Sequence, residues 1–169
     1  MITPKLIIHG GAGSLEGNIS KKDDLRDSLK IICKKTYEKL VKTDAYSAVL
    51  YGICELENDP LFNAGTGSKL QKDGRIRMSA GIMDGKKNIF SGVINIQNVK
   101  NPILVADKLQ NEKHKVIAGD KATQLARNLG FQQYNPLVQK RWNEHIRLQK
   151  GTTGTVGVVA LDKRGNIVA

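Results

Sequence analysis

The sequence of 169 residues is poor in cysteine, proline, aromatic residues and long apolar runs. Its two cysteines, Cys33 and Cys54, lack metal-ligand spacing and fall on the apolar faces of expected helices, which favours buried free thiols in a reducing compartment over a disulfide framework. The three histidines show no ligand spacing, and no run approaches the roughly 20 apolar residues that a membrane helix needs. Residues 1–5 lead straight into a strand pattern without a signal peptide, so we expect a cytoplasmic protein with no membrane partner.

Acidic residues are also few. The chain has 16 aspartates and glutamates and 27 lysines and arginines, which gives a formal net charge of +11. Such an excess can attract nucleic acid or an anionic surface. The basic residues are spread along the chain, however, and no basic stripe alternates with the aromatic residues, which make up only 5% of the sequence. We interpret the charge as a solvated, lysine-rich surface and expect no nucleic-acid partner.

The chain has the pattern of one domain, because neither an internal repeat nor a linker divides it and its length suffices for a sizeable core. Apolar periodicity and capping residues predict helices over 20–42, 45–59, 102–111, 120–129 and 139–149. Strands are predicted over 5–9, 89–97, 116–118, 155–162 and 166–169, with a hairpin of 69–71 and 75–80 around the turn 72–74. Composition and periodicity favour an α/β or α+β protein and no finer class.

A threonine that follows a glycine and opens a strand-like segment carries the strongest chemical signal. Gly154-Thr155-Val156-Gly157 precedes the apolar run 158–161. If the bond between Gly154 and Thr155 breaks, the freed α-amine, with a reference pKa of about 7.7–8.0, can act as the base that activates the hydroxyl of the same residue. Glycine can adopt the strained backbone that self-cleavage requires. An ordinary loop entering a strand is the alternative interpretation.

The glycine-rich turn at 9–13 leaves several interpretations open. It resembles the oxyanion loop of esterases, but the chain has no Gly-x-Ser-x-Gly elbow. It is an incomplete dinucleotide fingerprint, and the missing Gly-Lys-Ser/Thr excludes a phosphate loop. A tight turn after a strand is the simplest alternative, and His9 is interpreted as structural.

The segment 56–68 is rich in backbone carbonyls that a loop containing Pro60 would expose. Main-chain oxygens suffice to hold a monovalent cation, although a plain loop is the alternative. Asp84, which precedes Gly85, is interpreted as a turn residue. No Ser-His-Asp or Cys-His arrangement can be argued.

Four separated blocks, at 6–13, 56–68, 78–85 and 154–162, occur in the order seen in plant-type L-asparaginases, also called isoaspartyl peptidases. From about Leu6 onward the chain resembles the first part of that family's precursor. The resemblance implies an α+β fold, the four-layer αββα sandwich of N-terminal nucleophile hydrolases, incomplete in this chain. It divides the single domain 1–169 into an α-subunit-like segment, 1–154, and the start of a β-subunit-like segment, 155–169. It also implies a dimer of αβ heterodimers.

The resemblance further implies roles for individual residues. Thr155 is the catalytic nucleophile once the bond between Gly154 and Thr155 is cleaved, Asn63 orients the site, and Gly10 and Gly11 support it. The expected substrate is a small molecule or dipeptide, whose binding residues would lie beyond Ala169, and no cofactor is needed for catalysis. A structural sodium ion would be held by the main-chain oxygens of Leu56, Glu57, Asp59, Phe62, Ala64 and Thr66.

The resulting hypothesis is an amidohydrolase that cleaves the side-chain amide of L-asparagine, or β-aspartyl (isoaspartyl) peptides, after self-cleavage. Two alternatives stay open: a truncated, catalytically inactive asparaginase-like fragment, and a glycosylasparaginase-like amidase. One departure from the family pattern is the short, partly helical segment at 135–154, where relatives usually carry a long flexible linker.

Overall fold

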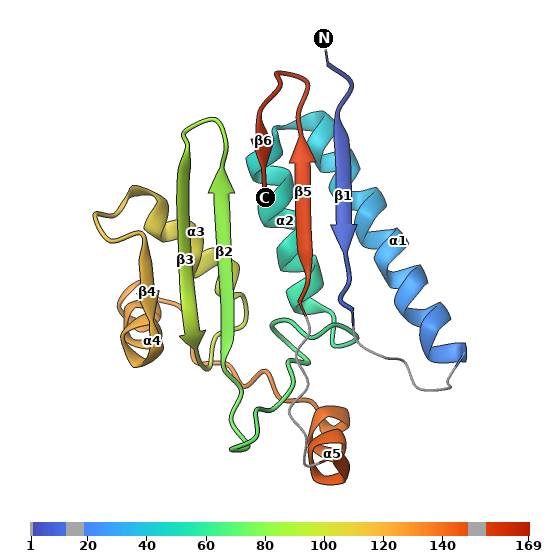
Figure 1. Ribbon diagram of the computed structural model, residues 1–169, viewed down its shortest axis with the longest axis vertical. Helices are drawn as coiled ribbons and strands as arrows, with labels where there is room; N and C mark the ends of the chain where they lie inside the picture. Colours follow the sequence, from blue (N-terminus) through green and yellow to red (C-terminus); the bar gives the residue numbers. More distant parts are fainter. Residues whose placement is uncertain (1, 13–18, 149–154) are drawn as a thin grey trace.

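A computed structural model describes residues 2–12, 19–148 and 155–169, which form one six-stranded sheet with helices on one of its faces (Figure 1). The sheet order is β1-β5-β6-β2-β3-β4. The strands are β1 (Lys5–His9), β2 (Met78–Asp84), β3 (Ile89–Ile96), β4 (Val116–Ala118), β5 (Gly157–Leu161) and β6 (Ile167–Val168). The helices are α1 (Ile19–Lys42), α2 (Ala45–Asn58), α3 (Pro102–Lys108), the 3-10 turn η1 (Leu109–Asn111), α4 (Gly119–Asn128) and α5 (Gln139–Leu148).

The predicted helices are confirmed, with ends that follow their capping residues. Asp44 adopts an extended backbone, and its carboxylate accepts a hydrogen bond from the backbone N–H of Ser47 at 2.9 Å, which starts α2. Pro102 is the first residue of α3, as expected of a residue with no N–H to satisfy. Gly130, with φ +84°, follows the end of α4.

The hairpin predicted around 72–74 is wrong, because residues 69–71 do not form a strand. A turn is present, and the N–H of Gln71 donates to the carbonyl of Arg75 at 2.8 Å. The Asp73 carboxylate accepts hydrogen bonds from the N–H of Arg75 and from the Arg77 guanidinium. Local side-chain hydrogen bonds, rather than pairing between two strands, therefore stabilise this turn. The true hairpin joins β2 to β3, with Asp84 paired to Ile89.

The two ends of the chain lie side by side in the sheet. β1 pairs antiparallel with β5 from Lys5↔Leu161 to His9↔Gly157. β6 lies between β5 and β2, and Ala169 exchanges two backbone hydrogen bonds with Met83. β4 pairs with β3 in parallel, so the sheet is mixed. This mixed sheet with helices is compatible with the expected α+β class.

Helices α1 to α4 pack on one face of the sheet and form two apolar cores. The first core lies between α1 and α2 and the strands β1, β5 and β6, and includes Leu40, Leu56, Phe62 and Val158. The second core joins α3 and α4 to β2 and β3. It is built from Met78, Val93, Ile96, Val99, Val105, Ala106, Leu109, Ala122 and Ala126. Side chains on the opposite strand face are exposed, as the alternating burial of β1 and β5 shows.

Cys33 and Cys54 are free thiols, as predicted, but both are half-buried rather than fully buried. Burial, together with the carboxylates of Glu57 and Glu55, raises the pKa of the Cys54 thiol to about 12. The thiol therefore stays protonated at neutral pH and is a poor nucleophile.

Candidate functional site

The pairing of β1 with β5 brings the glycine-rich turn to the predicted nucleophile. Beyond the last pair, His9↔Gly157, the two chains continue as Gly10-Gly11 and as Val156-Thr155. Gly11 has φ +108°, and a Cβ placed on it would lie 3.4 Å from the carbonyl oxygen of Thr155. Thr155 is an exposed residue. Gly154 lies outside the described residues.

Gly10 connects this turn to the loop at 59–68. A Cβ placed on Gly10 would lie 3.0 Å from a ring carbon of Phe62, a buried side chain of that loop. A larger residue would therefore push against the aromatic ring that packs beneath the turn. The structure thus places both predicted supporting glycines between the loop and Thr155.

Two glycines shape the loop that carries Asn63. Gly65 and Gly67 have φ of +49° and +89°, which L side chains rarely adopt. A Cβ on Gly65 would lie 2.3 Å from the Glu57 carbonyl oxygen, and one on Gly67 would lie 2.6 Å from that of Pro60. The N–H of Thr66 donates to the Glu57 carbonyl at 2.7 Å, so the loop folds back tightly onto the end of α2.

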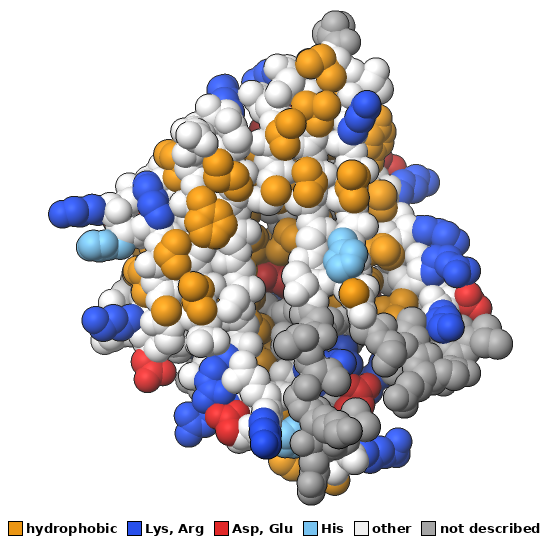
Figure 2. Space-filling model, in the orientation of Figure 1, with side chains coloured by type: hydrophobic (Ala, Val, Ile, Leu, Met, Phe, Trp, Pro, Cys, Tyr) orange, Lys and Arg blue, Asp and Glu red, His pale blue; other side chains and the backbone are white. Residues whose placement is uncertain are grey.

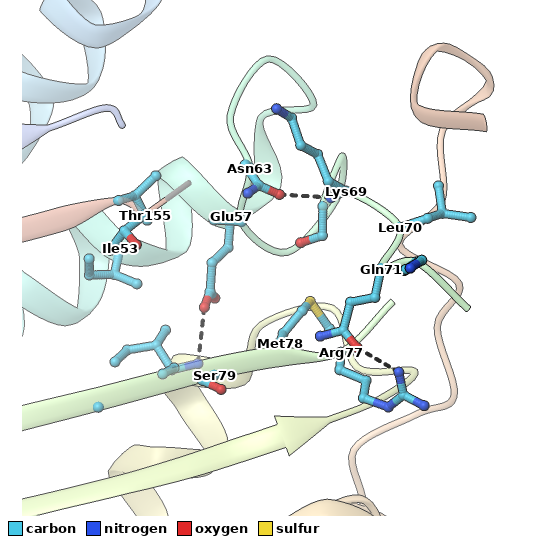
Figure 3. Close-up of a pocket in the computed structure, with 17 residues that line it drawn as sticks. Ile53, Glu57, Asn63, Lys69, Leu70, Gln71, Arg77, Met78, Ser79 and Thr155 are labelled. Carbon is cyan, nitrogen blue, oxygen red and sulfur yellow. Dashed lines mark hydrogen bonds between the residues drawn. The ribbon is translucent and has the colours of Figure 1, made fainter. Parts of the chain in front are cut away.

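Asn63 is held in this loop by its own side chain. Its Oδ1 accepts a hydrogen bond from the backbone N–H of Lys69 at 2.7 Å (Figure 3). Asn63 is half-buried and lines the same pocket as Thr155. The structure therefore brings together Thr155, Asn63, Gly10 and Gly11, which were predicted as site residues from separate segments of the sequence.

The pocket between these elements has a volume of about 710 Å³. Thr155 and Val156 line one side of the pocket. Asn63 comes from the loop and Lys69 follows it directly, as Figure 3 shows. The remaining lining residues are Ile53, Glu57, Ala64, Ser68, Leu70, Gln71, Lys72, Arg77, Met78, Ser79, Ala80, Gly81 and Ile103. Among the lining residues are the cationic Lys69, Lys72 and Arg77, and the Arg77 guanidinium is paired with the Asp73 carboxylate.

Glu57, a residue that is only 3% exposed, supplies a carboxyl group to this pocket. The carboxyl accepts hydrogen bonds from the N–H of Ile103 and from the Asn101 amide, both at 3.1 Å. These bonds favour the charged form, but burial outweighs them and raises the pKa of Glu57 to about 8. Glu57 thereby joins the end of α2 to the start of α3 with a carboxyl that is largely protonated at neutral pH.

The six residues predicted to hold sodium lie in or just before this loop. Three of the six main-chain oxygens accept hydrogen bonds: that of Glu57 from Thr66, that of Asp59 from the N–H of Phe62, and that of Phe62 from Arg141. A carbonyl oxygen has two lone pairs, so each can accept a second partner. Among the described residues, no group of three or more His, Cys, Asp or Glu side chains could hold a metal ion.

The interpretation of Asp84 as a turn residue is confirmed. Its buried carboxylate accepts hydrogen bonds from the N–H groups of Lys86 and Lys87 in the β2–β3 turn. Asp162 plays the same part in the turn before β6, where it accepts from Arg164 and Asn166. Neither aspartate lines the pocket.

Sequence reasoning missed two side chains that organise the site. Glu57 was selected only for its main-chain oxygen, although its place one residue after Leu56 on the apolar side of α2 signals burial. Arg141, 6% exposed, donates to the backbone of the loop. Its signal is weak, because a single arginine in a charged helix looks solvated.

Comparisons with known proteins identify relatives of this chain. A family model described as asparaginase matches residues 2–152. An isoaspartyl peptidase/L-asparaginase from Synechocystis sp. is 43% identical over 99% of this chain and 57% of its own length. A protein of the same name from Nostoc sp. is 40% identical, covering 98% of this chain and 59% of its own length. A plant-type L-asparaginase from Pyrococcus horikoshii is 40% identical over 86% of this chain and 49% of its own.

The chain therefore spans about half to three-fifths of the length of these relatives. None of the described helices is both long and apolar enough to cross a membrane.

Proposed function

The chain belongs to the asparaginase family, and we propose that it is part of an amidohydrolase that acts on L-asparagine or β-aspartyl peptides after self-cleavage between Gly154 and Thr155. The observation that carries the proposal is the position of Thr155. It is exposed, opens toward a pocket that Asn63 also lines, and has its backbone against Gly11. Relatives named isoaspartyl peptidase/L-asparaginase supply the substrate class.

Self-cleavage would use the hydroxyl of Thr155. Its Oγ attacks the Gly154 carbonyl carbon, a C–O bond forms, and the C–N bond breaks as the Thr155 nitrogen gains a proton. The product is an ester between Gly154 and the threonine hydroxyl. Water then hydrolyses this ester, which leaves a carboxylate on Gly154 and a free amine on Thr155.

Turnover would use that new amine as the base. It accepts the hydroxyl proton while Oγ attacks the substrate's side-chain amide carbonyl. The amine delivers the proton to the leaving nitrogen, which departs as ammonia or as the amino group of a peptide. Water then hydrolyses the acyl-threonine ester and releases aspartate. Asn63 would hold the nucleophile in orientation, and the cationic side chains at the pocket would attract the carboxylate of the substrate.

We further propose that the sheet belongs to a four-layer αββα sandwich. Helices cover one sheet face, while the other carries exposed apolar side chains, seen as a spread of orange across the front in Figure 2. On a sheet face that is open to water, the outward-pointing residues are normally polar. Here six outward-facing side chains are apolar and between 42% and 69% exposed: Ile7, Phe90, Ile94, Val116, Val159 and Ile167. Such a face favours cover by a second sheet.

Three smaller expectations accompany this proposal. A sodium ion would reinforce the loop at 59–68. Replacing sodium by choline in the buffer should then lower the melting temperature of the protein. The free thiols Cys33 and Cys54 favour a reducing, cytoplasmic setting. The dimer of αβ heterodimers stays a prediction, which light scattering of the purified protein tests.

An intact-mass time course of the full-length gene product tests the function directly. We expect a fragment that begins at Thr155, together with ammonia release from L-asparagine or aspartate release from a β-aspartyl dipeptide. Thr155→Ala should abolish both, whereas Thr155→Ser keeps the hydroxyl and should retain part of each. Cleavage at another bond, or cleavage that persists in Thr155→Ala, would contradict the assignment.

A further inference from the structure

The loop that carries Asn63 has two limbs, and one buried side chain from α5 bonds both of them. The Nε of Arg141 donates to the carbonyl of Gly67 at 2.6 Å. Its Nη2 donates to the carbonyls of Phe62 and Leu61 at 3.3 and 3.4 Å. Asn63 therefore lies between the two points at which a single guanidinium holds the loop. A guanidinium suits this task, because its planar fork carries five N–H donors in a fixed geometry.

The charge of Arg141 is buried and paired. The residue is 6% exposed, and its Nη1 donates to the Glu144 carboxylate on the same helix at 2.8 Å. Hydrogen bonds from a charged donor are shorter and stronger than those between neutral groups. The bonds of Arg141 to the three carbonyls are of this kind, so the guanidinium is a firm point of attachment for the loop.

The chain just before α5 bonds the same loop but reaches its second limb. The N–H of Gly67 donates to the carbonyl of Pro136 at 2.9 Å, and the hydroxyls of Tyr134 and Thr66 lie 2.9 Å apart. Of these three contacts from the segment 134–141, that of Arg141 reaches the first limb as well. Arg141 thereby ties the two limbs to each other.

The loop meets the site at two places. Asn63 lines the pocket that Thr155 also lines. The ring of Phe62 packs beneath Gly10, where a Cβ would lie 3.0 Å from a ring carbon. The neighbouring Gly11 lies against the Thr155 carbonyl oxygen. A shift of the loop would therefore move both Asn63 and the glycine turn relative to Thr155.

We propose that Arg141 is a positioning residue for turnover: it ties together the two limbs of the loop at 61–67 and so fixes Asn63 at the pocket wall. This inference rests on the proposed function, in which Asn63 orients the nucleophile. Arg141 is not among the residues that line the pocket, so its effect passes through the loop. Misplacing a site by about 1 Å can cost roughly a hundredfold in rate, even when the substituted residue is far from the chemistry.

A double-mutant cycle in the full-length gene product tests this route. It compares the wild type, Arg141→Ala, Asn63→Ala and the double variant. Arg141→Lys keeps the charge but loses the fork, and Arg147→Ala removes an exposed arginine of α5 as the matched control. The measurements are kcat and KM for a β-aspartyl dipeptide, counted per free Thr155. For a variant that stays uncleaved, the self-cleavage rate from intact-mass spectra enters the same cycle.

We expect Arg141→Ala to lower kcat about tenfold and to change KM less than about twofold, because the loop orients the nucleophile and does not bind the substrate. Arg141→Lys should be intermediate, and Arg147→Ala should match the wild type. In the Asn63→Ala background, Arg141→Ala should lower kcat by less than about threefold, since the group that it positions is gone.

Equal factors for Arg141→Ala in the two backgrounds would overturn the inference. A smaller folded fraction lowers the rate by the same factor in both backgrounds, so the cycle separates positioning from a purely structural role. A wild-type kcat in Arg141→Ala overturns the inference as well. Should Arg141→Ala fail to fold, the same cycle built with Arg141→Lys decides.

Failure of the two proposals can be told apart. If the wild-type protein neither cleaves at Thr155 nor releases aspartate from the dipeptide, the proposed function falls and the inference falls with it. If the wild type is active and Asn63→Ala is equally active, the inference falls because Asn63 needs no positioning. If Asn63→Ala is impaired and Arg141→Ala is not, only the inference falls.

Discussion

The buried carboxyl of Glu57 should give this protein a pH-dependent stability that one substitution removes. An unfolded chain releases the Glu57 proton near the ordinary pKa of 4.5, whereas the folded protein keeps it until about pH 8. Between these values the folded state binds more protons than the unfolded state. The free energy of unfolding therefore falls as pH rises through this window, and the loss is complete above about pH 8.

The size of the effect follows from the pKa difference. One pKa unit corresponds to about 1.4 kcal/mol, so a rise from 4.5 to about 8 gives a loss of at most roughly 5 kcal/mol across the window. Glu57→Gln keeps an oxygen that can accept from the N–H of Ile103 and carries no charge at any pH. Its amide nitrogen replaces the oxygen that accepts from the Asn101 amide, so the variant carries a pH-independent deficit of about 1 kcal/mol. Relative to the wild type, its free energy of unfolding should therefore rise by several kcal/mol between pH 5 and pH 8.

Urea unfolding followed by circular dichroism, at intervals from pH 5 to 9, measures this difference. Both proteins should carry Thr155→Ala, so that each is a single uncleaved species. Glu112→Gln, which removes an exposed carboxylate, is the matched control and should show no such divergence. Parallel pH profiles for the wild type and Glu57→Gln would show that the carboxyl is ionised in the folded protein and would refute the reasoning.

Three other substitutions test the site and the fold. Asn63→Ala should slow self-cleavage in the intact-mass assay while lowering stability by only about 1 kcal/mol, the cost of its bond to Lys69; unchanged cleavage would remove Asn63 from the site. Gly67→Ala should cost more than about 2 kcal/mol in urea unfolding, because its Cβ meets the Pro60 carbonyl, whereas Gly130→Ala has a similar φ and open space and should cost less. Phe90→Lys should destabilise the full-length protein more than Leu129→Lys, since only Phe90 lies on the sheet face proposed to be covered; equal thermal shifts would argue that this face stays open.

Local structure could be predicted wherever a capping residue or a strict period fixed it. Asp44, Pro102 and Gly130 each act within a few residues of the helix end that they define, so their effect is visible in sequence. The turn at 72–74 also has a clear signal, but whether its flanks pair depends on neighbours from elsewhere in the fold. The Asp73 carboxylate bonds the Arg77 guanidinium within that turn, so the turn forms without paired strands on either side. β2 pairs with β3 and β6 and not with residues 69–71.

The site was predictable in its parts but not in its assembly. Thr155, Asn63 and the two glycines were selected by residue type and order along the chain. Their proximity depends on a pairing of β1 with β5, which joins opposite ends of the sequence and leaves no local signal. Glu57 and Arg141 stayed unpredicted as side chains because their burial arises only when α2, α3 and α5 pack around one loop.

The arrangement bears on the proposal that one residue, Thr155, serves both in self-cleavage and in turnover. Thr155 begins a segment whose next residues enter β5, which pairs with β1 along its whole length and with β6 at Ala160 and Leu161. Such a strand fixes the backbone on the downstream side of the nucleophile, and that side is unchanged when the preceding bond breaks. Gly154, on the upstream side, lies outside the described residues. In the proposed mechanism, cleavage frees the amine of Thr155 while the carbonyl oxygen of this residue keeps its place against Gly11, at a pocket that Asn63 also lines.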